Sequence, residues 1–136
     1  MSATAQHAKN KLPSRILVVD PRQVDYDWLV RWVIANQGQV RFLATAQAAL
    51  RQRHNPAADL YLVNVRLPDL GGCDLVEMLR PFPPGAVVFL VADGYAVEDE
   101  VRALGLGVNG YLCKPLDPSL LCECRMGMEV NNSVSA

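Results

Sequence analysis

Short, largely apolar runs alternate along this chain with segments in which apolar residues recur at helical spacing. The apolar runs are 16–19, 40–44, 60–65, 87–91 and 110–113, and the segments of helical character are 22–37, 47–54, 73–80, 97–108 and 117–128. A strand that is apolar on both sides fits a parallel sheet with both faces covered. The alternation therefore predicts an α/β fold, a doubly wound five-stranded parallel sheet between two layers of helices.

Few topologies are available to five strands joined in this way, because crossovers between parallel strands are right-handed. The spatial order 2-1-3-4-5 is the natural choice. Such folds place their sites at the carboxyl ends of the strands, near the point where the strand order reverses, here between the first and third strands. That rule directs attention to Asp20-Pro21, Asn64, Val91-Ala92 and Lys114-Pro115.

Three motifs at these strand ends carry a family resemblance. Ile16 to Asp20 resembles the first strand of response-regulator receiver domains (CheY-like). Asn64 to Pro68, with Gly71-Gly72 behind it, resembles their phosphoacceptor strand and its loop, and Gly110 to Leu116 is similar to their fifth strand with its Lys-Pro signature. The resemblance runs from about residue 15 to residue 128. It implies a flavodoxin-like three-layer sandwich and a role in two-component signal transduction, with no enzymatic activity.

The chemistry of that family depends on five positions, and this sequence departs from it at three. Asn64 stands where the resemblance places the nucleophilic aspartate, and a neutral amide is neither a competent nucleophile nor a good magnesium ligand. Pro21 replaces the second acidic residue of the magnesium site, and Val91 replaces the hydroxyl residue that bonds the phosphoryl group. Asp20 and Lys114 remain, and we expect a salt bridge between them across an empty pocket.

These losses predict a degenerate receiver that works without phosphorylation, as a protein-interaction module. We expect no cofactor, and Mg²⁺ binding that is lost or weak. The four cysteines have no zinc-ligand spacing, so we expect no metal site and read them as ordinary thiols. In the family, Tyr111 would be the aromatic switch residue coupled to the hydroxyl group. With Val91 in its place, one hypothesis keeps Tyr111 in a single rotamer, and the simpler one has it packing against the fourth helix.

The partner predicted by this interpretation is a protein: a kinase, a regulator or a second copy of the chain in a homodimer. Glu98 and Arg102 belong to the polar surface of the fourth helix, which the family commonly uses for contacts, although a charged face is often simply solvated. Val30 and Ile34 fall away from the core side of the first helix, at a spacing that suits an interface, although scattered exposed apolar residues are normal. A formal net charge of −1 weakens a nucleic-acid-binding interpretation.

We expect residues 1–14 to be a disordered leader, 15–130 the receiver-like domain and 131–136 a flexible tail. No apolar run approaches the roughly 20 residues of a membrane span, and residues 1–14 lack the apolar core of a secretion signal, so we expect a cytoplasmic protein without membrane contact. Three alternatives stay open. In the first, the chain is the receiver part of a longer or two-piece transcriptional regulator with DNA-binding output. In the second it binds a small ligand at the remnant pocket, and in the third it is a phosphorylated receiver.

Overall fold

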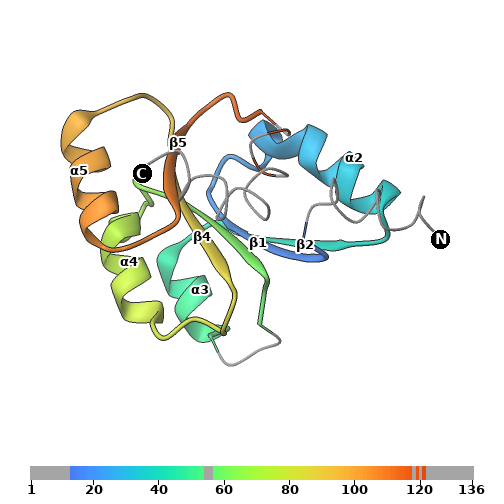
Figure 1. The fold of residues 1–136 in the computed structure, drawn as a ribbon, viewed down its shortest axis with the longest axis horizontal. Helices are drawn as coiled ribbons and strands as arrows, with labels where there is room; N and C mark the ends of the chain where they lie inside the picture. The colour runs from blue at the N-terminus through green and yellow to red at the C-terminus, as the bar shows by residue number, and fades with distance from the viewer. Residues whose placement is uncertain (1–12, 54–56, 118, 120, 122–136) are drawn as a thin grey trace, which may run out of the picture.

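The computed structural model describes residues 13–53, 57–117, 119 and 121, and a five-stranded sheet lies at its centre (Figure 1). The strands are β1 (Arg15–Val19), β2 (Gln39–Leu43), β3 (Leu60–Asn64), β4 (Val87–Ala92) and β5 (Gly110–Cys113). Their spatial order is β2-β1-β3-β4-β5, and every neighbouring pair is parallel. The predicted fold class and strand order are confirmed.

Helices cover both faces of the sheet (Figure 1). On one face the short 3₁₀ helix η1 (Gln23–Tyr26) leads into α2 (Asp27–Ala35), whose Leu29 and Val33 are buried against the strands. On the other face lie α3 (Ala46–Arg51), α4 (Gly72–Leu79) and α5 (Val97–Gly105). Within the described part of the chain, no helix has the length and apolar character needed to cross a membrane.

Strands β3 and β4 are buried at every position, which explains their continuous apolar sequences. Alternate residues along them face the two layers, so that Leu62 packs toward α2 while Val63 packs toward α3 and α4. Two separate apolar cores result, one on each side of the sheet. They hold the ends of the strands in fixed positions, and the polar residues that follow those ends are held with them.

The first helical segment differs from the prediction of one helix over 22–37. A 3₁₀ turn precedes α2, and this tighter winding turns Asp25 and Tyr26 toward the end of β1. Gln37, rather than Gly38, adopts the left-handed conformation after α2, with φ of 61°. Gly38 follows at a crowded position, where a Cβ atom would lie 3.0 Å from both the Ser14 carbonyl oxygen and a Val33 methyl group.

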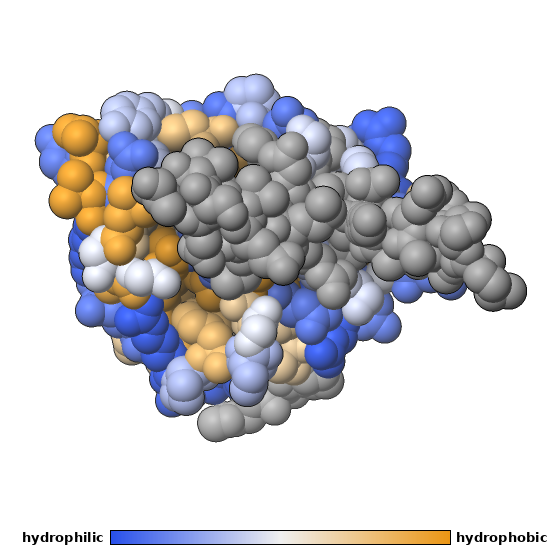
Figure 2. All heavy atoms as spheres, in the orientation of Figure 1, coloured by the Kyte–Doolittle hydropathy of each residue, from blue (hydrophilic) through white to orange (hydrophobic). Residues whose placement is uncertain are grey.

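The apolar stripe predicted over 97–108 lies on the outside of the molecule. Val97, Val101 and Leu104 are 54%, 65% and 57% exposed, and Figure 2 shows apolar surface gathered over α5. Ala103 is the residue that α5 buries against the sheet side. The helix ends at Gly105, so Val108 follows it rather than extending its face.

Residues 1–12, most of the predicted last helix and the tail at 131–136 lie outside the described residues. Pro13 and Ser14, which the sequence assigned to the leader, are described. Pro13 is buried, and the carbonyl oxygen of Ser14 accepts a hydrogen bond from the Gln39 backbone at 2.7 Å. The Ser14 backbone therefore already pairs with the start of β2.

Candidate functional site

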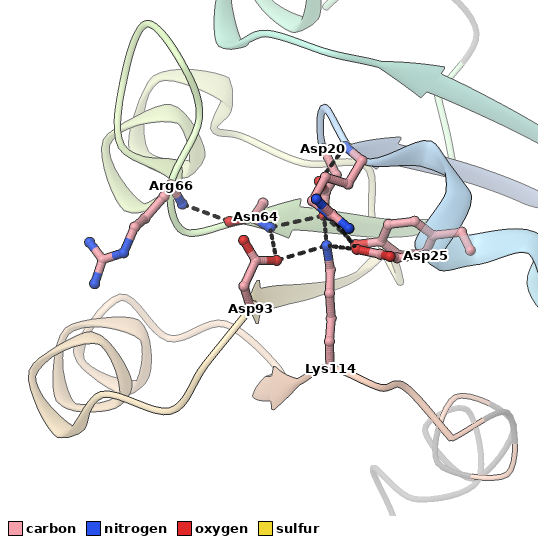
Figure 3. A network of polar contacts seen from close by, with 8 residues as sticks. Asp20, Asp25, Asn64, Arg66, Asp93 and Lys114 are labelled. Atoms are coloured by element: carbon pink, nitrogen blue, oxygen red, sulfur yellow. Dashed lines mark hydrogen bonds and ion pairs between the residues drawn. The ribbon is translucent and has the colours of Figure 1, made fainter.

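Four polar side chains converge at the carboxyl ends of the central strands (Figure 3). Asp20 follows β1, Asn64 ends β3, Asp93 follows β4 and Lys114 follows β5. Parallel strands end at one edge of the sheet, so residues far apart in the sequence meet there. A fifth group, Asp25, reaches the same place from η1.

Lys114 lies at the centre of this cluster. Its ammonium is 2.8 Å from a carboxylate oxygen of each of Asp20, Asp25 and Asp93, and its side chain is only 10% exposed. It also lies 5.3 Å from the centre of the Tyr26 ring, within cation–π range. The ion pair predicted between Asp20 and Lys114 is therefore present, and two further carboxylates, which the prediction did not include, also contact the lysine.

The opposite charges of this cluster stabilise one another in their ionised forms. Hydrogen bonds from Lys114 hold the pKa of Asp25 and that of Asp93 below the usual range of an aspartate. Burial alone would lower the pKa of Lys114, but its hydrogen bonds to three carboxylates outweigh burial and raise it. Lys114 is therefore protonated and its partners Asp25 and Asp93 are ionised at neutral pH.

Asn64 is buried and its amide is fully used. Its Nδ2 donates to Asp20 Oδ2 at 2.9 Å and to Asp93 Oδ1 at 3.2 Å. Its Oδ1 accepts from the backbone N–H of Arg66 at 2.8 Å. The amide thus presents two N–H donors to carboxylates at the position where the family resemblance expects an ionised oxygen. An amide satisfies this environment, and a carboxylate would meet like charge there.

Asp20 is the most deeply buried acid of the cluster and the one with most partners. Its Oδ1 accepts from the backbone N–H of Arg22 at 2.9 Å, and its Oδ2 accepts from the Tyr26 hydroxyl at 2.7 Å. Burial, and then the charge of Asp20, raises the pKa of Tyr26, so this phenol stays a donor. With Asn64 and Lys114 also bound to it, Asp20 is satisfied by four groups within the chain.

Two of the predicted site residues lie at this edge without joining the polar network. Pro21 is exposed at the start of the loop after β1 and offers no side-chain ligand. Val91 pairs in register with Asn64, but its side chain is fully buried in the apolar core on the α2 side. The structure therefore brings together Asp20, Asn64 and Lys114, and it leaves Pro21 and Val91 outside the network.

Sequence reasoning missed Asp25 and Asp93. Asp93 had a usable signal, because it follows a buried strand at the predicted edge of the sheet, one residue beyond Val91-Ala92. Asp25 had none, since only the 3₁₀ turn brings it to Lys114. At the rim, Arg22 pairs with Asp25 at 3.1 Å. The remaining surface hollow is lined by Arg22, Asp25, Asp93, Lys114 and Pro115.

Tyr111 points toward the loop before α5. Its hydroxyl accepts from the Ala96 backbone N–H at 3.1 Å and lies 3.5 Å from the Ala96 carbonyl oxygen, to which it donates. The Tyr95 ring meets it edge to face, with centroids 6.0 Å apart. Tyr111 faces the α3–α5 side of the sheet and Val91 faces the α2 side. Tyr111 therefore contacts the loop that leads into α5, next to the helix against which it was predicted to pack.

The residues predicted as interface candidates are accessible to different degrees. Ile34 is 67% exposed, whereas Val30 is half-buried. Glu98 and Arg102 are exposed, and Arg102 forms an ion pair with Asp74 across the surface between α5 and α4. Arg66, two residues after Asn64, pairs with Asp99 at 3.1 Å and ties the β3–α4 loop to α5.

Comparison with known proteins gives consistent matches over most of the chain. The family model described as "Response regulator receiver domain" matches residues 16–124. An uncharacterised 14.6 kDa protein of Leptolyngbya boryana is 34% identical over 106 residues, which cover 76% of this chain and 80% of that protein. The regulatory protein VanRc of Enterococcus gallinarum is 31% identical over 108 residues, 79% of this chain and 46% of VanRc.

A solved structure supports the same assignment. The CheY-like receiver domain protein of Methanospirillum hungatei superimposes with a TM-score of 0.72 at 27% identity, and the match covers 90% of this chain and 98% of that one. The chain spans less than half of VanRc but nearly all of this single receiver domain.

Proposed function

This chain belongs to the response regulator receiver domain family, and from that premise we propose that it is an atypical receiver that signals by binding a protein partner, without being phosphorylated. One observation carries the proposal. The Asn64 amide donates two hydrogen bonds into a cluster of carboxylates that already holds its own cation, Lys114. Receiver domains are signalling modules rather than classical enzymes, and the proposal keeps that role.

A phosphoryl group lacks an acceptor in this site. Transfer to a receiver requires a nucleophilic oxygen at the end of β3, and Asn64 presents an amide nitrogen with no available lone pair toward the cluster. The nearby carboxylates of Asp20 and Asp93 are already bound to Lys114 and to Asn64 itself. An incoming phosphate would meet these two negative charges, and neither Val91 nor Ala92 at the end of β4 offers a hydroxyl donor.

The residues of this site fit Mg²⁺ poorly. Lys114 lies 2.8 Å from each of the three carboxylates, so an entering cation would have to displace an ammonium held by three ion pairs. Pro21 offers no side-chain oxygen ligand, and the Asn64 amide turns its hydrogens toward Asp20. Mg²⁺ requires near-ideal octahedral oxygen ligation. We therefore expect magnesium binding to be lost or weak, with Lys114 serving as the resident counter-charge.

The signal would then come from a constant surface rather than a switched one. Tyr111 is bound to both polar groups of the Ala96 backbone, which favours the single-rotamer hypothesis. The adjacent face of α5 exposes Val97, Val101 and Leu104 (Figure 2). Exposed apolar side chains gathered on one helix are typical of a protein contact. The occupant is a kinase, a regulator or a second copy, in the cytoplasm and without direct contact to nucleic acid or membrane.

The test is incubation of the full chain with acetyl phosphate and Mg²⁺, followed by intact-mass analysis. A receiver domain with an aspartate at the acceptor position serves as the positive control. We expect the control to gain one phosphoryl group and this chain to gain none. Stoichiometric labelling that is stable in acid and labile in base, as an acyl phosphate is, would overturn the proposal.

A second function has one observation in its favour. The chain spans less than half of VanRc, a regulatory protein. It could therefore be the receiver part of a longer or two-piece transcriptional regulator whose output domain binds DNA. Sequencing the complete reading frame, and measuring DNA binding by the full product, distinguishes this alternative from a stand-alone interaction module.

A further inference from the structure

A cavity lies at the opposite end of the sheet from the polar cluster, under the C-terminal ends of α3 and α4. Its volume is about 230 Å³. In Figure 1 this region lies near the lower ends of α3 and α4. Buried residues of the sheet and of α3 form its base: Leu17, Ala49 and Tyr61. Asp20, Asn64 and Lys114 are not among the residues that line this cavity.

One wall of the cavity is aromatic and fixed in place. The rings of Tyr61 and Phe82 meet edge to face with centroids 4.9 Å apart. The Tyr61 hydroxyl accepts a hydrogen bond from the Ala58 backbone at 3.2 Å, which anchors the ring. Pro81 and Pro83 flank Phe82 and restrict that segment further. The wall therefore suits a flat aromatic ligand at little conformational cost.

The charged residues among the described lining are two arginines. Arg41 and Arg53 line the cavity together with Gln52, and no aspartate or glutamate is among the lining residues that the structure describes. Arg41 donates to the Gln52 side-chain oxygen at 2.8 Å, which orients both groups. Guanidinium groups match the planar geometry of carboxylates, so the charge of this lining complements an organic anion.

We propose that this cavity binds a small aromatic carboxylate, of one ring or two fused rings. The volume is below the usual 300–1,000 Å³ or so of drug-sized ligand sites, which limits the ligand to about this size. The ring lies against Tyr61 and Phe82, and the carboxylate faces Arg53. The proposal is independent of whether the domain is phosphorylated.

The experiment is a titration of the ¹⁵N-labelled full chain with indole-3-acetate, followed by amide chemical shifts. Indole-3-acetamide has the same shape without the charge and is the control ligand. We expect saturable shifts in the millimolar range or tighter at the residues around Tyr61 and Phe82, and binding of the amide weaker by about tenfold or more, as expected for the loss of a charge-assisted hydrogen bond.

Two arginine variants separate the cavity from general surface charge. Arg53, in the turn after α3, lines the cavity, whereas Arg51, the last residue of α3, is exposed and is not among the lining residues. We expect Arg53→Gln to weaken indole-3-acetate binding by about tenfold and Arg51→Gln to leave it unchanged. The proposal is overturned by an absence of saturable shifts, by equal binding of acid and amide, or by equal effects of the two variants.

Discussion

Replacing Asn64 by the aspartate that the family uses is expected to destabilise this protein. In the native chain the Asn64 amide donates to Asp20 at 2.9 Å and to Asp93 at 3.2 Å. Asn64→Asp turns both contacts into pairs of carboxylate oxygens. The shape of the side chain hardly changes, so the effect reports the charge environment of the site and little else.

The protein can respond to the introduced carboxyl by keeping it charged or by keeping it protonated. The response that costs less free energy sets the size of the destabilisation. Two like charges about 3 Å apart repel by about 5 kcal/mol at an effective dielectric constant of about 20. Keeping the introduced carboxyl protonated at about pH 7 costs less, about 4 kcal/mol, which is roughly three pH units above its ordinary pKa at about 1.4 kcal/mol each. The loss of unfolding free energy at neutral pH is therefore expected to approach, and not exceed, about 4 kcal/mol.

The pH dependence identifies the cause. A carboxyl whose pKa is higher in the folded state than in the unfolded state destabilises the fold above the unfolded value, near 3.9, and this penalty disappears as the pH falls toward it. Urea unfolding with EDTA present should show the full loss at about pH 7 and less than about 1 kcal/mol of it at about pH 4.5. Asn64→Ala removes the same donors without adding charge, so its cost should vary much less with pH. Equal losses for Asn64→Asp at both pH values, or no loss at pH 7, would refute the electrostatic reasoning.

Three further predictions concern other substitutions. Lys114→Met leaves its carboxylate partners facing one another, and we expect a loss of about 3–5 kcal/mol at neutral pH in urea unfolding; because the pKa values of two of those partners are lowered, the loss should shrink as the pH falls below about 4. Gly72→Ala would place a Cβ atom 2.0 Å from a carbonyl oxygen of β3, so it should cost about 3 kcal/mol or more by the same assay, whereas Gly94→Ala, with open space around it, should be nearly neutral. Glu at both Val30 and Ile34 should weaken self-association or partner binding measured by light scattering and pull-down, and unchanged assembly would exclude that face of α2.

The sequence predicted the positions at the end of each strand better than the contacts between them. Asn64 ends a strand, and Asp20 and Lys114 directly follow strands, so the topology alone brings them together. Asp25 lies inside a segment of helical periodicity, and its role depends on a 3₁₀ turn that periodicity does not distinguish from a helix. The prediction of a single ion pair was therefore incomplete, because the chain supplies two further acids to the lysine.

The helix over 97–108 shows a second limit. Periodicity correctly placed Val97, Val101 and Leu104 on one face of α5, but the spacing of apolar residues does not say which side of a helix the sheet covers. Ala103, a small residue, allows close approach to the sheet, while the larger side chains remain outside. Burial was decided by packing between helices and strands, which a single sequence does not encode locally.

The hydrogen bonds around Asn64 also affect how readily its side chain deamidates. An asparagine deamidates when the backbone nitrogen of the next residue attacks its side-chain carbonyl carbon, and the product includes aspartate. Here that nitrogen, in Val65, donates to the Val91 carbonyl oxygen at 2.8 Å, while both ends of the Asn64 amide are bound within the site. The attack of the Val65 nitrogen on the Asn64 side chain, which closes a ring, would require breaking these hydrogen bonds at the buried end of a strand. The fold therefore protects Asn64 from the slow chemical conversion to aspartate.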